Sequence, residues 1–244
     1  MSNQTNKVVT RSIQQRQLKD AAVPQFEEIQ KEPAGSFYSQ GAEAKIFLND
    51  NKITKQRTQK SYRLKELDEK IRKIRTRSEF KILEKASKII SIPSNLELNE
   101  NKKEIYMDFI DGKKLSQYLD TFKLSEQKEI INQIGKSIAK LHDANIIHGD
   151  LTTSNIIIVK KEVDGQGTLV PYLIDFGLGF QNGKIEDKAV DIHLLRQALE
   201  AKHFKNWEVL FNEFLKSYSS SKDGKKVLER FKKVESRGRY KEKY

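Results

Sequence analysis

Apolar residues recur at helical spacing in two long stretches of the chain. In residues 64–87 they are Leu64, Leu67, Ile71, Ile74, Phe80 and Leu83, and in residues 124–145 they are Ile130, Ile134, Ile138 and Leu141. A spacing of three to four residues places such side chains on one face of a helix. We therefore predict a long helix in each stretch, with Ser125 as the N-cap of the second. Two or three more helices are expected between residues 187 and 232.

Shorter stretches, rich in β-branched and aromatic residues, have the pattern of strands. They are residues 37–48 (strand, tight turn, strand), 52–57, 95–104 (a hairpin with a polar turn) and 105–112. Two more, residues 155–159 and 169–174, flank the turn-forming sequence at 163–167 and predict a further hairpin. The order of elements predicts an α+β fold: a small β-rich part with one long helix, followed by a helical part.

Composition narrows the class of protein. The 244 residues carry a formal net charge of +12, contain no cysteine and have no apolar run near the ~20 residues that span a membrane. The first 15 residues lack the apolar core of a signal peptide. We expect an intracellular soluble protein without disulfides, and the positive charge favours an anionic partner such as nucleic acid.

The candidate chemistry lies around the second hairpin. One motif reads His148-Gly149-Asp150-Leu151-Thr152-Thr153-Ser154-Asn155, and the other reads Ile174-Asp175-Phe176-Gly177. The hairpin would bring Asn155 and Asp175 to neighbouring strand ends. An Asp five positions before an Asn, followed by Asp-Phe-Gly, is how a protein-kinase fold assembles a phosphoryl-transfer site. Asp150 would accept or orient the proton of the attacking oxygen, and Asn155 and Asp175 would hold Mg²⁺ beside ATP.

The first half of the chain offers the complementary nucleotide-binding residues. The loop Gln40, Gly41, Ala42, Glu43 and Ala44 would cover the phosphates, although it has one glycine where three are usual. A plain hairpin would also explain it. Lys55 is the candidate for a phosphate-binding lysine paired with Glu79 on the long helix, and a surface lysine on an edge strand is the alternative.

Met107, Asp108 and Ile110 lie where a kinase hinge would bind adenine, and an ordinary buried strand and turn would fit the same residues. His148 is read as a structural histidine because Asp150 already fills the role of base. His142, His193 and His203 are read as structural too, since no metal-ligand spacing joins them.

Two basic regions are candidates for contacts with an anion or a partner. On the long helix, Arg72–Arg77 has no acidic residue nearby in sequence to offset it, whereas Glu66, Asp68 and Glu69 offset the helix start. The second region is the tail, residues 232–241, where Tyr240 could stack on a base. A solvated helix face and a solvated terminus are the alternatives.

Features of conventional protein kinases are missing. Gly149 stands where an Arg would precede the catalytic Asp, and no Ala-Pro-Glu follows Asp175. The chain reaches a new helix near Asp187, which predicts a shortened activation segment. Without that Arg, ordering of the segment by phosphorylation is not expected, so the enzyme would be constitutively assembled or gated by a partner.

These motifs resemble the small atypical kinase/ATPase subunits of KEOPS (also called EKC) complexes, which are relatives of the RIO kinases. The resemblance covers about residues 37–240 and also includes Lys60-Ser61-Tyr62-Arg63, Arg75-Thr76, Glu186-Asp187-Lys188-Ala189-Val190-Asp191, Phe214-Leu215-Lys216-Ser217-Tyr218 and Arg237-Gly238-Arg239. It implies a two-lobed kinase fold, ATP hydrolysis with Mg²⁺, and support of N6-threonylcarbamoyladenosine formation next to the anticodon of tRNA.

The resemblance also implies partners and residue roles. The partners are the ASKHA-fold threonylcarbamoyltransferase subunit, other KEOPS subunits, and tRNA bound through the basic surface and tail; the compartments are cytoplasm and nucleus. Lys55 would bind ATP, and Asp191 would anchor the catalytic segment from below. The end of the chain departs from the family, because residues 240–244 include Glu242 and are less basic than the usual tail.

The expected organisation is a disordered arm (1–34), an N-lobe (35–110), a C-lobe (111–232) and a basic tail (233–244). Three other functions fit parts of the pattern. A stand-alone serine/threonine kinase would share the whole site. A small-molecule phosphotransferase would share His-Gly-Asp and the later Asp, but would lack the Gly-Ala-Glu-Ala loop. A scaffold that has lost catalysis is disfavoured because the candidate catalytic residues are all present.

Overall fold

The computed structural model describes residues 36–41, 43–163 and 166–238. The predicted N-terminal arm therefore lies outside the described residues, as do Ala42 and residues 239–244 of the predicted tail. Within the described part of the chain, no helix is long and apolar enough to cross a membrane.

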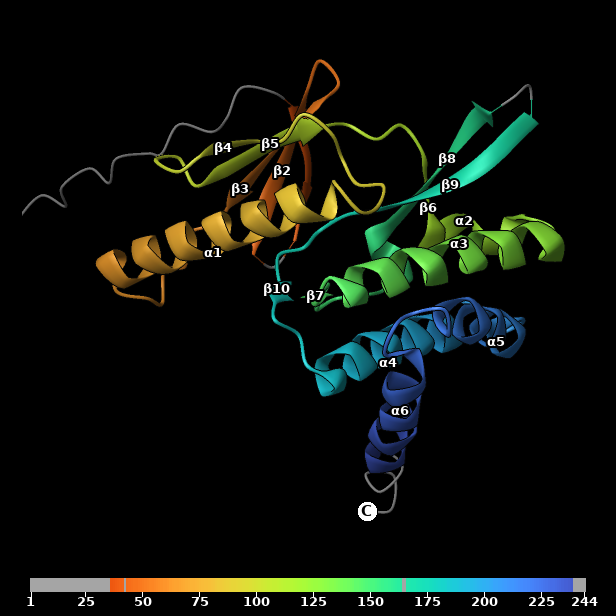
Figure 1. Ribbon diagram of the computed structural model, residues 1–244. Coiled ribbons are helices and arrows are strands. Elements are labelled where there is room, and N and C mark those ends of the chain that lie inside the picture. The colour runs from red at the N-terminus through yellow and green to blue at the C-terminus, as the bar shows by residue number, and fades with distance from the viewer. Residues whose placement is uncertain (1–35, 42, 164–165, 239–244) are drawn as a thin grey trace, which may run out of the picture. The chain divides into compact units, whose positions relative to one another are not determined.

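The first part of the fold is a five-stranded antiparallel sheet in the order β1-β2-β3-β5-β4 (Figure 1). Its strands are β1 (Ser36–Gln40), β2 (Ala44–Asn49), β3 (Lys52–Arg57), β4 (Glu97–Asn99) and β5 (Glu104–Asp108). Asp50 and Asn51 both have positive φ, which suits the two-residue turn that joins β2 to β3. The strands predicted between residues 37 and 112 are thus present.

Helix α1 (Lys65–Ala86) follows β3 and lies across the sheet (Figure 1). The predicted helix is correct, but its apolar period does not mark the buried face. Leu64, Leu67 and Ile74 are at least half exposed, whereas the buried residues of α1 are Asp68, Arg72, Thr76, Glu79, Ile82, Leu83 and Ala86. The polar side chains can be buried because they pair, as when Arg72 Nε donates to Asp68 at 2.6 Å.

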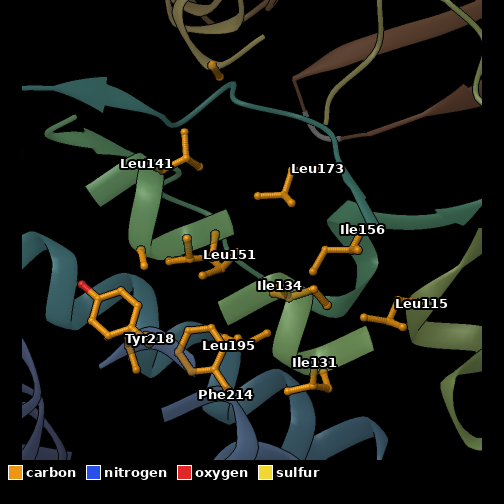
Figure 2. Packing of buried hydrophobic residues seen from close by; sticks show 14 of the residues in the cluster. Leu115, Ile131, Ile134, Leu141, Leu151, Ile156, Leu173, Leu195, Phe214 and Tyr218 are labelled. Carbon is orange, nitrogen blue, oxygen red and sulfur yellow. The ribbon is translucent and has the colours of Figure 1, made fainter. Parts of the chain in front are cut away.

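The second part of the fold is mainly helical. Its helices are α2 (Leu115–Tyr118), the 3-10 turn η1 (Leu119–Thr121), α3 (Leu124–Asp143), the 3-10 turn η2 (Thr153–Asn155), α4 (Ile185–Lys202), α5 (Trp207–Tyr218) and α6 (Gly224–Gly238). Ile134 of α3 is fully buried near Leu195 of α4 and Phe214 of α5 (Figure 2), and Leu141 of α3 is fully buried in the same cluster. The predicted apolar stripe of α3 is therefore confirmed.

Two details of this part follow from local chemistry. The N-cap of α3 is Lys123, whose backbone N–H donates to Glu126 Oε2 at 2.9 Å, so the prediction of Ser125 as N-cap is wrong. Ser125 lies inside the helix because the Glu126 carboxylate already satisfies the first free N–H.

Gly135 lets α3 approach α5 closely, since a Cβ there would lie 2.9 Å from the Phe214 carbonyl oxygen.

Short strands connect the helices and form the base of the site. Hairpin β8 (Ile156–Val163) and β9 (Gln166–Leu173) pairs Ile156 with Leu173, and β6 (Lys113–Lys114) adds to it. Strand β10 (Phe180–Gln181) pairs with β7 (Ile146–Ile147). The chain then reaches α4 at Ile185, so the predicted short activation segment is present. Helix α6 runs to Gly238 and includes the first residues of the predicted tail.

Candidate active site

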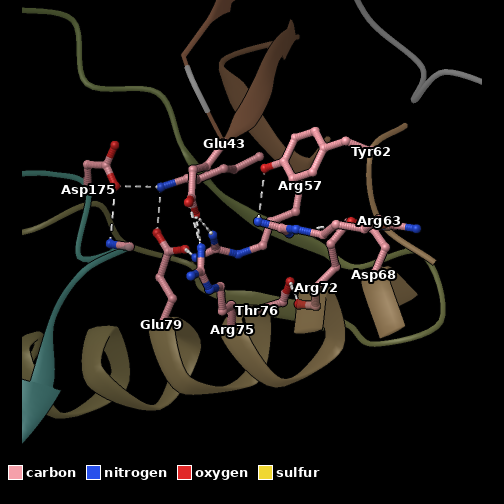
Figure 3. A network of polar contacts seen from close by, with 12 residues as sticks. Glu43, Arg57, Tyr62, Arg63, Asp68, Arg72, Arg75, Thr76, Glu79 and Asp175 are labelled. Atoms are coloured by element: carbon pink, nitrogen blue, oxygen red, sulfur yellow. Dashed lines mark hydrogen bonds and ion pairs between the residues drawn. The ribbon is translucent and has the colours of Figure 1, made fainter. Parts of the chain in front are cut away.

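Lys55 lies in the middle of β3, paired in register with Ile46 and Ile105. Its side chain is almost fully buried. Its Nζ lies 2.6 Å from Glu79 Oε1 on α1 and 2.7 Å from Asp175 Oδ1 beyond β9 (Figure 3). The structure thus brings together three predicted site residues from three distant segments, and the predicted Lys55–Glu79 pair is present.

The electrostatics of this cluster favour its charged forms. Burial acts to lower the pKa of Lys55, but the carboxylates of Glu79 and Asp175 outweigh burial and raise that pKa above its ordinary value. Burial acts to raise the pKa of Asp175, but the Lys55 ammonium and the Gly177 N–H hold it below the ordinary range. Asp175 is therefore a carboxylate over the whole neutral range, as a metal ligand must be.

The catalytic segment between β7 and η2 is held from below by a carboxylate. Asp191 on α4 is buried and accepts the backbone N–H groups of His148 at 2.7 Å and Gly149 at 2.9 Å. The His142 ring also contacts Asp191, at 3.3 Å, and bonds to the Tyr218 hydroxyl on its other side, at 2.8 Å. The geometry is that of the anchor expected of Asp191.

Asp150 and Asn155 lie together at the surface of this segment. The Asn155 side-chain N–H₂ donates to the Asp150 carboxylate at 2.8 Å and to the Asp150 backbone carbonyl at 2.9 Å. Ile174 N–H donates to the Asn155 carbonyl at 3.0 Å, which places Asn155 beside the strand end that leads to Asp175. These two bonds engage the nitrogen of the Asn155 amide.

His148 has the contacts of a structural histidine. It is fully buried beside Phe176; its Nε2 donates to the Ile174 carbonyl at 3.1 Å, and its Nδ1 accepts the Asp150 N–H at 3.3 Å. Both ring nitrogens have partners only in the neutral form. Burial lowers the pKa of His148, which agrees with that form. The histidine thus orients Asp150 instead of acting as a base.

The structure explains why residue 149 is a glycine, which the sequence alone does not. Its φ is +78°, and a Cβ at this position would lie 2.3 Å from the Leu178 carbonyl oxygen. Only glycine fits this close approach of the activation segment. The residue that replaces the usual Arg is therefore fixed by packing.

The loop Gln40–Ala44 lies between β1 and β2, and Ala42 falls outside the described residues. Gly41 N–H donates to the Ala44 carbonyl at 2.9 Å, and the Glu43 carbonyl accepts Thr58 N–H at 3.0 Å. The Glu43 carboxylate pairs with Arg75 of α1, at 2.5 and 2.6 Å, and with Arg57 of β3, at 3.0 Å. Hydrogen bonding by Arg75 lowers the pKa of Glu43. These pairings could not be predicted from the sequence, because their members lie far apart in the chain.

The same contacts correct the interpretation of Arg72–Arg77 as an uncompensated basic face. Arg72 pairs with Asp68, Arg75 pairs with Glu43, and Arg77 pairs with Glu100. The offsetting carboxylates of Arg75 and Arg77 come from other elements, which spacing along one helix cannot show.

The predicted hinge residues follow the sheet. Met107 is buried on β5, and the Asp108 carboxylate accepts the Ser94 hydroxyl and the Asn95 amide, both at 2.8 Å. The Asp108 N–H donates to the Ser94 carbonyl at 3.0 Å, so it already has a partner. Ile110 follows two residues later and is half-buried. Adenine contacts of these residues stay a prediction.

A hollow of about 540 Å³ lies beside this stretch and is lined by Asp50, Asn51, Lys52, Asp108, Phe109 and Asp111. It includes none of Lys55, Asp150 or Asp175. It shares only Asp108 with the predicted hinge residues.

Comparison with known proteins agrees with this geometry. Residues 40–222 match the protein kinase domain family. The structure of the Rio2 kinase–ADP/Mg²⁺–phosphoaspartate complex from Chaetomium thermophilum superposes with a TM-score of 0.54 and 17% identity, covering 84% of this chain and 71% of that one. The chain belongs to the protein kinase family.

Relatives define the branch. The KEOPS complex subunit Bud32 of Pyrococcus abyssi is 38% identical over 217 residues, covering 83% of this chain and 95% of the relative. A probable bifunctional tRNA threonylcarbamoyladenosine biosynthesis protein of Methanococcus maripaludis is 34% identical over 205 residues, covering 82% of this chain and 35% of the longer relative. Within the protein kinases, the chain belongs to the Bud32 family.

Proposed function

We propose that this chain is the serine/threonine-type kinase subunit of a KEOPS assembly, and that it binds and hydrolyses ATP in support of threonylcarbamoyladenosine formation in tRNA. The observation that carries the proposal is the convergence of Lys55, Glu79 and Asp175, beside the Asp150–Asn155 pair, in a member of the Bud32 family.

Each residue has a role that its contacts support. When ATP binds, Lys55 would exchange its contact with Asp175 for one with the phosphates, while its ion pair with Glu79 holds its side chain in position. Asn155 fixes one oxygen of the Asp150 carboxylate, which leaves the other to accept the proton of the attacking oxygen. The loop Gln40–Ala44 would cover the phosphates, and Met107, Asp108 and Ile110 would contact adenine.

The donor set near the catalytic segment fits Mg²⁺. Asn155 offers an amide oxygen and Asp175 a half-exposed carboxylate, which are hard ligands. The described residues contain no cluster of three or more His, Cys, Asp or Glu side chains around a metal site. Mg²⁺ characteristically takes one or two protein ligands with substrate phosphates and, when bound, neutralises the charge that develops on them.

Partners are proposed from the family. The relative in P. abyssi is named as a KEOPS subunit, and this chain matches 35% of a longer relative that is named as a probable bifunctional tRNA threonylcarbamoyladenosine biosynthesis protein. We expect this chain to contact the corresponding ASKHA-fold subunit and, through basic side chains, tRNA. The compartments expected for such a subunit are cytoplasm and nucleus.

Steady-state phosphate release from Mg-ATP, with and without the partner subunit and tRNA, tests the proposal. Asp150→Ala should lose turnover and keep ATP binding, because Asp150 acts on the attacking group. Asp175→Ala should lose both turnover and Mg-dependent binding. Glu84→Ala, at an exposed position of α1, is the matched control and should behave like wild type.

Two outcomes would contradict the proposal. One is wild-type protein that binds no ATP in the presence of Mg²⁺. The other is phosphoryl transfer to a protein acceptor at a rate that exceeds ATP hydrolysis by the assembled complex, which would favour the stand-alone kinase.

A further inference from the structure

Four charged side chains connect the nucleotide loop to the lysine that the site depends on. Arg75 Nη1 lies 2.5 and 2.6 Å from the two Glu43 oxygens, and Arg57 Nη1 lies 3.0 Å from Glu43 Oε2. The other end of the Arg57 guanidinium, Nη2, lies 2.6 Å from Glu79 Oε2. Glu79 Oε1 in turn accepts Lys55 Nζ at 2.6 Å (Figure 3). An unbroken series of ion pairs therefore joins the loop, β3, α1 and Lys55.

The two ends of this series differ in exposure. Arg57 and Glu79 are buried, whereas the side chains of Glu43 and Arg75 are each 42% exposed. A buried carboxylate shared by two cations has little freedom to move. An ion pair exposed to this extent contributes little to folding stability. Loss of the Glu43–Arg75 pair should therefore change folding stability little.

The loop has fewer glycines than a kinase phosphate-binding loop usually has. Ordinary kinase loops have three glycines, whose backbone N–H groups approach the phosphates closely. Here Gly41 is the only glycine of the loop, and its N–H already donates to Ala44. The Glu43 side chain instead pairs with Arg75 of α1 and Arg57 of β3.

We propose that Glu43, Arg57 and Arg75 are positioning residues for ATP: they hold the nucleotide loop against α1 and keep Glu79 aimed at Lys55. This inference rests on the proposed use of ATP by this site. The Arg75–Glu43 pair sets the position of the loop and therefore the affinity for ATP. The Arg57–Glu79 pair sets the position of Lys55 and therefore the rate of the chemical step.

Charge-neutral substitutions in the full chain test this assignment. Glu43→Gln and Arg75→Gln should each raise the Kd and KM for Mg-ATP about tenfold, the size expected for loss of one charge-assisted hydrogen bond, with kcat changed less than about twofold. The double variant should be no worse than Glu43→Gln alone, because Glu43→Gln already breaks the Glu43–Arg75 pair that Arg75→Gln removes. Arg75→Lys, which keeps the charge, should recover part of the affinity.

Arg77→Gln is the matched control. Arg77 lies on the same helix and also pairs with a carboxylate, but that partner is Glu100 in the turn between β4 and β5, away from the loop. Its KM for ATP should equal that of wild type. All of these variants should keep Tm within about 2 °C of wild type, as expected for exposed ion pairs.

The proposal is overturned if Arg75→Gln has the same ATP affinity as Arg77→Gln, if the effects of the two single substitutions add in the double variant, or if affinity falls only in step with Tm. Asp150→Ala separates this result from failure of the proposed function. If wild type and Asp150→Ala both bind ATP while the Glu43 and Arg75 variants bind it equally well, only the positioning role is wrong. If wild type binds no ATP, the proposed function fails first.

Discussion

At the scale of single residues, the site depends on side chains whose state is set by burial. His148 is the clearest case. Its Nε2 donates to the Ile174 carbonyl, and its Nδ1 accepts the Asp150 N–H. A second proton would remove the acceptor and place a charge in a buried position. Lys55 and Asp175 show the opposite behaviour, since each is kept charged by the other.

This predicts a pH dependence of stability. The pKa of His148 is lower in the folded protein than in the unfolded chain, so below about pH 6.5 the unfolded chain binds more protons and stability falls. The loss should approach about 1.4 kcal/mol per pH unit until the folded pKa is reached. Urea unfolding at pH 7.5, 6.5 and 5.5 measures it. His148→Gln should flatten the slope; an equally steep slope in this variant would show that the histidine is not responsible.

The residue roles were predictable to different degrees. Asp150, Asn155 and Asp175 could be named as candidates because the motifs that contain them are local in sequence, whereas Lys55 was indicated only by its place on a predicted strand. The partners of Glu43 could not be named, since Arg57 and Arg75 reach it only after the sheet and α1 have packed. The reason for Gly149 is likewise a contact with Leu178, which spacing does not encode.

At the scale of elements, periodicity predicted helices α1 and α3, but it located the buried face fully only in α3. Helix α3 buries its apolar stripe as expected. Helix α1 buries polar residues such as Arg72 and Glu79 together with Leu83, while Leu67 and Ile74 are at least half exposed. Hydrophobic patterning assumes that polar groups prefer water, and this assumption fails where buried charges satisfy one another.

Gly135→Ala tests the packing of α3 on α5. Alanine in an exposed helix interior is normally about 1 kcal/mol better than glycine. Here the added Cβ would lie 2.9 Å from the Phe214 carbonyl oxygen and still closer to the Ser217 hydroxyl, so the helices must separate. We expect the free energy of unfolding to fall by about 1–3 kcal/mol, measured by urea denaturation.

Lys136→Ala, at the next and exposed position, is its control and should change stability by no more than about 0.5 kcal/mol. If Gly135→Ala matched or exceeded wild-type stability, the close helix approach would not hold in solution.

At the scale of the whole molecule, the order of strands and helices followed from the sequence because each hairpin and helix carries its own local signal. The predicted lobe boundaries at residues 110 and 232 stay predictions.

The net charge of +12 indicated an anionic partner, but several of the cations are neutralised by distant carboxylates. Basic residues that could meet tRNA are therefore fewer than the composition indicates.

A hollow of about 770 Å³ between α4 and α6 is a better candidate for a contact with tRNA than the paired Arg72–Arg77 face of α1. It is lined by Lys184, Ile185, Glu186, Lys226, Glu229, Arg230, Lys232 and Lys233. The double substitution Lys232→Ala and Lys233→Ala should weaken tRNA binding and reduce the slope of log Kd against log salt by about 1–2. Filter binding between 50 and 200 mM salt, a range of about fourfold, measures this slope.

The matched control replaces Lys136 and Lys140, two exposed lysines of α3, and should leave the slope unchanged. Equal slopes for both double variants would remove this surface from the tRNA contact.

The close approach of Leu178 to Gly149 has a consequence for how this enzyme could ever be controlled. Installing the arginine that lets other kinases respond to a signalling phosphate would require the segment around Leu178 to be rebuilt at the same time, because any side chain at this position strikes the main chain. A single codon change to arginine at position 149 therefore cannot by itself install this phosphate-responsive contact.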